Sequence, residues 1–270
     1  MEKLIEIVQF FILGVLQGIT EPLPISSSGH LVIVQHFFQL PNLTYFLEVY
    51  LHVASLLAIV VFYRVKIKSL VVGVYKFVIK KDQTYKTDWH YFLLLLLATV
   101  PAAFFGLLFL TFFESFLNLL AVGLSLLVTG SILLLVHRSS VENKKETINI
   151  KDALSIGFFQ VFALLPGISR SGATMTGGLL RGVKFEKVLE FSFLLYIPVT
   201  IGSSLLMIPE INANLGYTPV PLAIAFIAST VMTYLALKWF ILLVKKGNLK
   251  YFSVYCYIVG SLSILLALFL

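Results

Sequence analysis

The amino-acid sequence predicts an all-α polytopic membrane protein with six transmembrane helices and two re-entrant helical hairpins, arranged as an inverted-topology repeat. Three observations support this fold class. The chain of 270 residues is 59% hydrophobic and 12% charged, with a mean hydropathy of +0.97, so it carries more apolar surface than a soluble core can bury. A short polar motif occurs twice in the chain, and the basic residues gather in a few loops.

Six apolar runs are long enough to be transmembrane helices, which need about 20 residues to cross roughly 30 Å of hydrocarbon. These runs lie near 44–63, 90–110, 117–137, 188–207, 221–243 and 250–270. Two further apolar segments, 4–39 and 153–181, are each interrupted in the middle by proline and glycine. We therefore expect the interrupted segments to fold differently from the six spans.

The two interrupted segments contain the repeated motif. Adding 143 to the positions of the stretch Gly14 to Leu31 gives the stretch Gly157 to Thr174. Six residues recur without a gap: Gly14, Gln17, Ile25, Ser26, Ser28 and Gly29 are matched by Gly157, Gln160, Ile168, Ser169, Ser171 and Gly172. Five of the six are polar or glycine, so shared hydrophobicity does not explain them. The sequence predicts a single membrane domain over 1–270, duplicated as repeats of about 1–140 and 141–270.

Each interrupted segment has the composition of two short helices joined by a turn. Pro22 and Pro24 end the first helix, because proline lacks an N–H and disfavours helical geometry in the residue before it. A serine of the run 26–28 can then cap a second helix, and Ser169 or Ser171 can do the same after Pro166. Irregular backbone is tolerated at membrane depth only where protein or water surrounds it, so we expect two re-entrant hairpins.

The distribution of charge predicts the topology. Seventeen of the 20 lysines and arginines lie in four segments, 64–89, 138–152, 181–187 and 245–250, which the predicted spans place on one side. The loops expected on the other side, 40–43, 111–116 and 208–220, contain none. By the positive-inside rule the basic side is cytoplasmic, both termini face out, and the second hairpin enters from the opposite face to the first. The net charge of +7 is then a membrane signal, and we expect no nucleic-acid partner.

The second copy of the motif has the features of an anion site. Arg170 is an ionisable residue inside a membrane segment, where such groups are costly and usually functional. Hydroxyls surround it in the sequence, and the helix that restarts there directs free N–H groups to the same place. The planar fork of arginine favours phosphate as the ligand. The expected phosphate-binding residues of this copy are Ser169, Arg170, Ser171 and Thr174.

The first copy adds residues suited to acid–base chemistry. Gln17 and Glu21 are four apart and share a helix face, and Ser27 and His30 are three apart on the next helix. We interpret Glu21, Ser27 and His30, together with Arg170 of the second copy, as catalytic candidates, with Gln17 and Ser26 as binding residues. The alternatives are structural: an ion pair of Glu21 with Arg170, a capping or core histidine, and a plain serine cap.

The remaining polar residues of the membrane segments have plainer interpretations. Glu48 and His52 form an i,i+4 pair near the end of a span, and Glu190 has the corresponding place in another span. Anchoring at the interface or bonding between helices explains these three. His36, His90 and His137 are far from the motifs, and no cluster has the spacing of zinc ligands.

These motifs resemble those of the undecaprenyl pyrophosphate phosphatases, also called bacitracin resistance proteins. The run Gln17 to Glu21 fits a (Glu/Gln)xxxGlu motif followed by Ser26 to His30, and the run Pro166 to Thr174 fits PGxSRSxxT. The resemblance extends along essentially the whole chain. Gln17 stands where some members have glutamate, which weakens a mechanism that needs two carboxylates there.

The resemblance implies a bacterial plasma-membrane hydrolase that removes the terminal phosphate of the C55 polyprenyl pyrophosphate, regenerates the carrier lipid of cell-wall synthesis and confers bacitracin resistance. It also implies stimulation by Mg²⁺ or Ca²⁺, for which Glu21 is the candidate ligand, and it leaves a homodimer open. Carried over by motif, the functional positions are Gln17, Glu21, Ser27, His30, Ser169, Arg170, Ser171 and Thr174.

Two mechanisms and a second class of protein stay open at this point. Ser27 is the favoured nucleophile, with His30 moving its proton and Glu21 orienting the reaction or binding the metal; the alternative is attack by water with Glu21 or His30 as base. Inverted repeats with broken helices are also the anatomy of secondary transporters, so a lipid-phosphate transporter or flippase is the alternative function. The asymmetry of the two copies favours the enzyme, with an active site that opens outward.

Overall fold

The structure is a computed structural model, and it describes all residues except 1, 39–44, 139–144, 207–217, 245–248 and 270. Within the described ranges every regular element is helical, apart from one isolated bridge between Lys145 and Val183. The elements are α1 (Glu2–Thr20), α2 (Ser27–Phe37), α3 (Tyr45–Phe62), α4 (Arg64–Val78), η1 (Gln83–Tyr85), α5 (Lys86–Leu108), α6 (Leu110–Glu114), α7 (Leu119–Arg138), α8 (Ile150–Phe162), α9 (Arg170–Leu179), α10 (Phe185–Leu206), α12 (Pro219–Val244) and α13 (Leu249–Phe269). The predicted all-α class is confirmed.

Six of these helices are long and apolar enough to span a membrane. They are Lys3–Thr20, Gln83–Leu108, Leu119–His137, Phe185–Leu206, Pro219–Leu243 and Leu249–Phe269. Large apolar side chains such as Phe104 and Leu135 are exposed on their outer faces, as a lipid environment allows. Five of the six match predicted spans, and the sixth is α1, which the sequence analysis placed in a hairpin.

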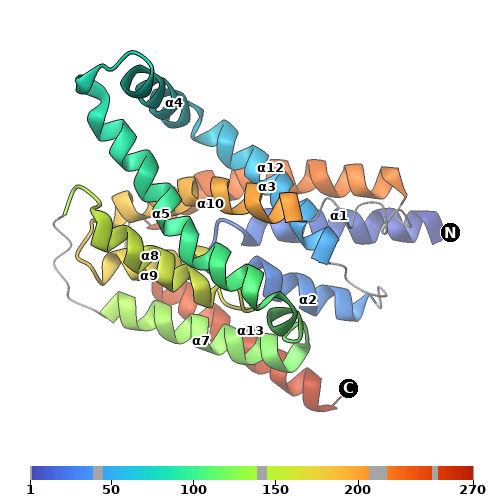
Figure 1. Cartoon of the computed structure of the whole chain (residues 1–270). Helices are drawn as coiled ribbons and strands as arrows, with labels where there is room; N and C mark the ends of the chain where they lie inside the picture. The colour runs from blue at the N-terminus through green and yellow to red at the C-terminus, as the bar shows by residue number, and fades with distance from the viewer. Residues whose placement is uncertain (1, 39–44, 139–144, 207–217, 245–248, 270) are drawn as a thin grey trace.

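The predicted span at 44–63 differs from the other five. It forms α3, but α3 runs into α4 after a single residue with a bend of 80°, and only the two helices together pass as a candidate span. Lys66 Nζ on α4 pairs with Glu190 Oε1 on α10 at 3.1 Å, which fixes the bent arm against the bundle. The basic segment 64–89 therefore begins with a helix, α4, which leaves the bundle at a steep angle (Figure 1).

Two helical hairpins point in opposite directions. Helices α1 and α2 run to the middle of the molecule and back to the end where the N-terminus lies, whereas α8 and α9 enter and leave at the other end (Figure 1). The breaks fall where the prolines predict them, after Thr20 in one hairpin and after Phe162 in the other. Consequently, the two turns meet inside the molecule.

The first helix of each hairpin packs against a long helix of the other half of the chain. Helix α1 lies along α12, and α8 lies along α5. The motif glycines make this possible, because a Cβ at Gly14 would collide with the backbone of Ala225, and one at Gly157 would collide with the backbone of Ala98. Helices α3 and α10 follow the same rule, since they pack against α12 and α5, and α7 pairs with α13.

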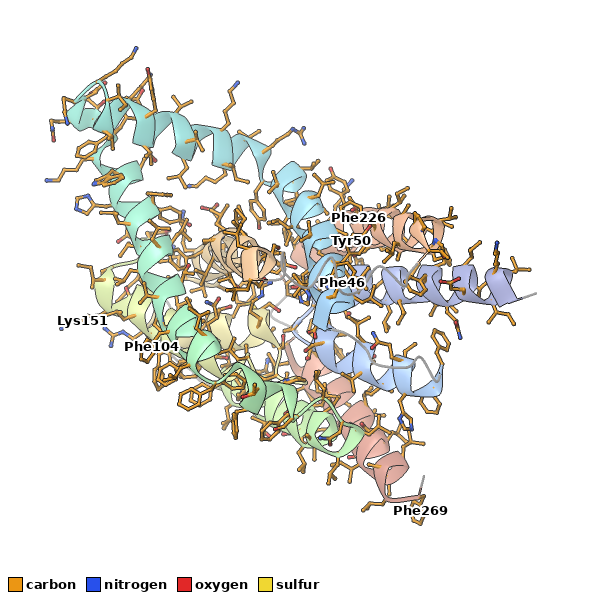
Figure 2. All side chains as sticks on the ribbon, turned by 45° about the vertical axis from the view of Figure 1, so that its right-hand side comes forward. Phe46, Tyr50, Phe104, Lys151, Phe226 and Phe269 are labelled. Atoms are coloured by element: carbon orange, nitrogen blue, oxygen red, sulfur yellow. The ribbon has the colours of Figure 1, made fainter. Side chains whose placement is uncertain are left out.

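The apolar core surrounds the two turns. Its largest cluster joins Leu23 and Ile25 of the first turn to Met175 on α9, Phe193 on α10 and Phe240 on α12. Aromatic side chains also fill the α3–α12 contact, where Tyr50 lies 5.9 Å from Phe46 and 5.4 Å from Phe226 between ring centroids (Figure 2). Apolar side chains therefore pack around the polar groups of the first turn.

Candidate active site

The second helix of each hairpin begins at equivalent positions of the repeated motif. Helix α2 begins at Ser27 and α9 at Arg170, and the serine before each helix is its N-cap. Ser26 Oγ accepts from the N–H of Gly29 at 3.3 Å, and Ser169 Oγ accepts from the N–H of Gly172 at 3.2 Å. Two helix N-termini, with their unsatisfied N–H groups, therefore lie at the centre of the molecule.

The two hairpin turns contact each other directly. Ser171 Oγ donates to the carbonyl of Leu23 at 3.3 Å, and the N–H of Gly167 lies 3.5 Å from Ser28 Oγ. Gly167 has a φ of +93°, a left-handed conformation that suits glycine. Thr129 on α7 stabilises this turn, because its hydroxyl donates to the Gly167 carbonyl at 3.0 Å and accepts from the Ser169 N–H at 3.2 Å.

Glu21 is the centre of the polar network at this meeting point. Its side chain is buried, and it accepts three hydrogen bonds: from Gln17 Nε2 at 3.0 Å, from Ser27 Oγ at 2.6 Å and from Arg170 Nη2 at 3.0 Å. The 2.6 Å contact is the geometry of a nucleophile and its base. The structure thus brings together four predicted site residues from three segments of the chain.

The guanidinium of Arg170 has three partners. Besides Glu21, it donates from Nη1 to the carbonyl of Ser192 at 3.3 Å, and its guanidinium carbon lies 4.1 Å from the ring centroid of Tyr196. Thr174, one turn along α9, donates to the Arg170 carbonyl at 2.9 Å and shares a 2.6 Å contact with Ser192 Oγ. Thr174 therefore ties the start of α9 to Ser192 on α10.

His52 on α3 belongs to this network, which the sequence analysis did not predict. Its Nε2 lies 3.3 Å from Glu21 Oε2, and its Nδ1 lies 2.7 Å from the carbonyl of Glu48. Tyr196 on α10 donates from its hydroxyl to the His52 carbonyl at 3.0 Å. Of the two readings given for His52, bonding between helices is the one that the structure bears out, because its contacts reach Glu21 and Tyr196. The available signal was a pair of ionisable residues, Glu48 and His52, in an apolar span.

His30 lies elsewhere. Its Nδ1 is 2.7 Å from the carbonyl of Ser26, and its Nε2 is 2.8 Å from the hydroxyl of Tyr255 on α13, whose ring it also stacks upon. His30, a residue of α2, therefore faces α13, and both of its ring nitrogens have partners. Its spacing of three from Ser27 does not bring the two side chains to one partner.

A polar cavity of about 180 Å³ lies at the network. Its lining includes Glu21, Ser26, Ser27, Ser28, Glu48, His52, Gln160, Ser169, Arg170, Ser171 and Tyr196. Gln160 is the repeat equivalent of Gln17, but its buried amide has no hydrogen-bond partner among the described residues, since Leu164 stands where the first copy has Glu21. An orphan amide in a polar cavity is available to a ligand.

An apolar cavity of about 280 Å³ adjoins the polar cavity. Its lining includes Ala102, Ala103, Gly106, Leu107, Leu164, Pro166, Pro198 and Leu206. Ser28, Glu48, Val199 and Ser203 are among the residues that line both cavities, so the two share a wall. The arrangement offers a place for an anionic group next to a place for an aliphatic chain.

The residues around Glu21 do not fit a protein-held metal ion. Both of its carboxylate oxygens already accept from donors, one of them a guanidinium. Among the residues that the structure describes, no group of three or more histidines, cysteines, aspartates or glutamates is placed to hold a metal. Divalent cations prefer several oxygen ligands, so Glu21 is better suited to accept a proton than to bind a cation.

Taken with the six apolar helices, this arrangement defines the class: a multi-pass membrane protein with a candidate anion site where two helical hairpins meet. Residues 10–262 match the family model described as bacitracin resistance protein BacA, and the chain belongs to that family.

Proteins of several bacilli are similar over almost the whole chain. A protein of Bacillus thuringiensis (strain Al Hakam) named undecaprenyl-diphosphatase 2 is 42% identical over 98% of this chain and 99% of its own. The undecaprenyl-diphosphatase of Oceanobacillus iheyensis is 41% identical over 95% of both chains. The undecaprenyl-diphosphatase 1 of Halalkalibacterium halodurans is 40% identical over 94% of both.

Proposed function

We propose that this protein is an undecaprenyl-diphosphatase, which hydrolyses the terminal phosphate of C55 polyprenyl diphosphate to regenerate the carrier lipid of bacterial cell-wall synthesis and confers bacitracin resistance. The observation that carries the proposal is the contact of Ser27 with Glu21 at 2.6 Å, beside the guanidinium of Arg170. A nucleophile, its base and a phosphate-binding fork meet at two helix N-termini. The names of the relatives agree with this activity rather than with lipid transport.

The proposed reaction uses the network as it stands. Ser27 Oγ attacks the terminal phosphorus and gives its proton to Glu21, while the bond to the bridging oxygen breaks and the lipid phosphate leaves. Water then hydrolyses the phosphoserine. Arg170 and the N–H groups of α2 and α9 stabilise the charge on the phosphate oxygens. Direct attack by water on the phosphorus, with Glu21 as base, is the alternative. His30 does not line the polar cavity, so this reaction assigns it no step. Proton transfer by His30 stays a prediction.

The remaining binding residues have distinct proposed roles. Ser26, Ser169 and Ser171 line the polar cavity and can donate to the diphosphate. Gln17 and Thr174 act through Glu21 and Arg170, which they hold in place. The apolar cavity is suited to the first isoprene units of the lipid chain, because its lining is aliphatic and it begins at the polar cavity.

We propose that both hairpins are re-entrant and that residues of about 1–140 and 141–270 form inverted repeats within one domain. The opposite directions of the hairpins and the exchanged packing of α1 with α12 and α8 with α5 support this. The cytoplasmic side would be the end with α4, η1 and the starts of α5, α8 and α10. Both termini would then face out of the plasma membrane, and the active site would open outward.

The described residues form no ligand set for the expected Mg²⁺ or Ca²⁺. Since Glu21 is engaged by other donors, we propose that a divalent cation would bind through the oxygens of the diphosphate itself. A homodimer stays a proposal, to be tested by the mass of the purified protein in detergent.

The decisive experiment is phosphate release by purified protein in detergent with C55 polyprenyl diphosphate. Detergent removes the second compartment that transport needs, so turnover there supports a hydrolase. Glu21→Gln, which keeps the size of the side chain and removes the base, is the matched inactive control. Binding of the lipid without phosphate release by the unmodified protein would instead favour a flippase.

A further inference from the structure

His52 holds a hydrogen on Nδ1. This nitrogen lies 2.7 Å from the main-chain carbonyl of Glu48, one turn earlier on α3. A carbonyl oxygen only accepts hydrogen bonds, so the nitrogen at this distance must donate. In a neutral imidazole the other nitrogen, Nε2, would then carry no hydrogen.

The Nε2 of His52 faces another acceptor. It lies 3.3 Å from Glu21 Oε2. Arg170, which is charged at any pH that the protein meets, pairs with the other oxygen of the same carboxylate at 3.0 Å, and Gln17 also donates to Glu21. These donors match the ionised form of Glu21. In a neutral His52, the lone pair of Nε2 would face the negative Oε2 of Glu21, and the two would repel each other. A hydrogen on Nε2 makes the contact a charge-assisted hydrogen bond.

His30 provides the internal comparison. Its Nδ1 also lies 2.7 Å from a carbonyl one turn earlier, that of Ser26, and must likewise donate. However, its Nε2 meets the hydroxyl of Tyr255 at 2.8 Å, and a hydroxyl can donate to an unprotonated nitrogen. His30 is therefore satisfied as a neutral ring, whereas His52 is satisfied only with hydrogens on both nitrogens.

We infer that His52 is an imidazolium in the resting protein and acts as the general acid of the reaction, the partner of the base Glu21. This inference rests on the proposed phosphatase function. His52 and Ser27 both line the polar cavity and both contact Glu21 Oε2, so the imidazolium lies beside the nucleophile. The charged and titratable groups that surround it are Glu21, Arg170 behind that carboxylate, Glu48 on the same helix, and Tyr196 on α10.

The proton balance of the proposed step closes. When Ser27 Oγ bonds to phosphorus, its proton passes to Glu21, and the Nε2 proton of His52 passes to the bridging oxygen as the bond to phosphorus breaks. The two residues are then neutral together, so the loss of one charge does not leave the other unpaired. When water hydrolyses the phosphoserine, its proton returns to His52, and the proton of Glu21 returns to Ser27 Oγ.

The kinetic test compares His52→Gln with His90→Gln over a range of pH. Glutamine can keep a hydrogen bond to Glu21 but cannot carry the acidic proton. His90 is a matched control, since its Nδ1 makes the same contact with a carbonyl one turn earlier, that of Lys86, on the exposed surface of α5. General acid–base catalysis contributes about 10²- to 10⁴-fold, so kcat of His52→Gln should fall at least about a hundredfold with little change in KM.

The shape of the pH profile separates an acid from a merely structural histidine. A reaction that needs a protonated acid should have an alkaline limb in its pH profile, so turnover of the unmodified protein should decline at high pH, and His90→Gln should show the same decline. The residual turnover of His52→Gln should lack that alkaline limb. If His52→Gln keeps the limb, or keeps more than a third of the kcat, His52 is not the acid.

The charge state has a test that does not depend on turnover. The chain has five histidines, so ¹⁵N-histidine spectra are simple, and the signal missing in His52→Gln identifies His52. We expect hydrogens on both its nitrogens at neutral pH, and a neutral ring in Glu21→Gln. A neutral His52 in the unmodified protein overturns the inference. A doubly protonated His52 in a protein that releases no phosphate would remove the phosphatase assignment and the acid step, while the charged pair would stand.

Discussion

Glu21 and Arg170 are separated by 149 residues in the chain, yet their carboxylate and guanidinium lie 3.0 Å apart. The glutamate stands at the turn of one hairpin, and the arginine opens the last helix of the other. Each half of the chain therefore supplies the charge that the other half lacks. Because both side chains are largely buried, removal of Glu21 would leave the Arg170 guanidinium without its carboxylate partner.

Replacement of Arg170 by lysine should abolish most activity although the charge is kept. Arg170 donates from two nitrogens in different directions and stacks on Tyr196, and a lysine cannot do all three. Loss of one donor to a developing oxyanion costs about 10²- to 10³-fold in rate. The measurement is kcat at saturating substrate, with Arg181→Lys as control, because Arg181 pairs with Asp152 away from the cavity. A variant that kept a third of the kcat would show that charge alone suffices.

Replacement of Ser27 by alanine should remove nearly all turnover and leave binding of the lipid intact. Ser27 Oγ is the hydroxyl that contacts Glu21, and the capping of α2 by Ser26 does not depend on it. Ser55→Ala is the matched control, since Ser55 is a buried serine that bonds Thr233 at the α3–α12 contact. Phosphate release and lipid binding are measured on the same preparations. Full activity of Ser27→Ala would favour direct attack by water.

Tyr255→Phe should leave kcat close to that of the unmodified protein. The Tyr255 hydroxyl bonds His30 outside the polar cavity, so its loss should cost stability, about 1 kcal/mol for a hydrogen bond, rather than chemistry. Thermal unfolding and kcat are measured together. A hundredfold fall in kcat without loss of fold would support the proton transfer by His30 that the sequence predicts.

Gly14→Ala and Gly157→Ala should each lower the stability of the fold. Each added methyl would meet backbone of the neighbouring helix, and overpacking of this kind costs roughly 1–3 kcal/mol. Gly202→Ala in α10 is the control, because nothing lies within 4 Å of its added Cβ. Unfolding temperatures in one detergent decide the matter. Equal shifts for all three variants would show that helix propensity, and not close packing, is responsible.

The membrane topology can be tested with single cysteines in a Cys256→Ser background. Ser115, between α6 and α7, and Thr84, in η1, are both exposed, and they lie beyond the two opposite ends of the long helix α5. From the charge of the loops we expect an impermeant thiol reagent to label Ser115→Cys in intact cells and to spare Thr84→Cys until the membrane is opened. Labelling in the reverse order would mean that the proposed orientation is wrong.

Most of the fold could be predicted because hydropathy and proline act locally. The span predicted at 117–137 is α7, and the first helix of each hairpin ends shortly before Pro22 or Pro166, as expected. The bend after Phe62 could not be predicted in this way. It depends on where α4 meets the rest of the bundle, as in the pair of Lys66 with Glu190, and no local pattern reports such a contact.

The site was predicted in part for the same reason. The motif spacing brings Ser27 near Glu21, and the second copy of the motif places Arg170 at the equivalent helix start. The direction in which a helix presents a side chain depends on its neighbours, and the sequence does not reveal them. His30 was therefore expected at the polar cavity but lies against α13. His52 was expected only to anchor its span or to bond between helices, yet it contacts Glu21.

Because the site lies where the two hairpin turns meet, activity depends on close contact between the two halves of the chain. Neither hairpin holds a complete catalytic set, and the contacts that join them, such as Ser171 with Leu23 and Gly167 with Ser28, are few and long. A slight separation of the halves would part Glu21 from Arg170 while every helix stayed formed. On gradual heating, activity should therefore be lost at a lower temperature than the helical circular dichroism. Lipids that stabilise the contact between the halves should bring these two temperatures closer together.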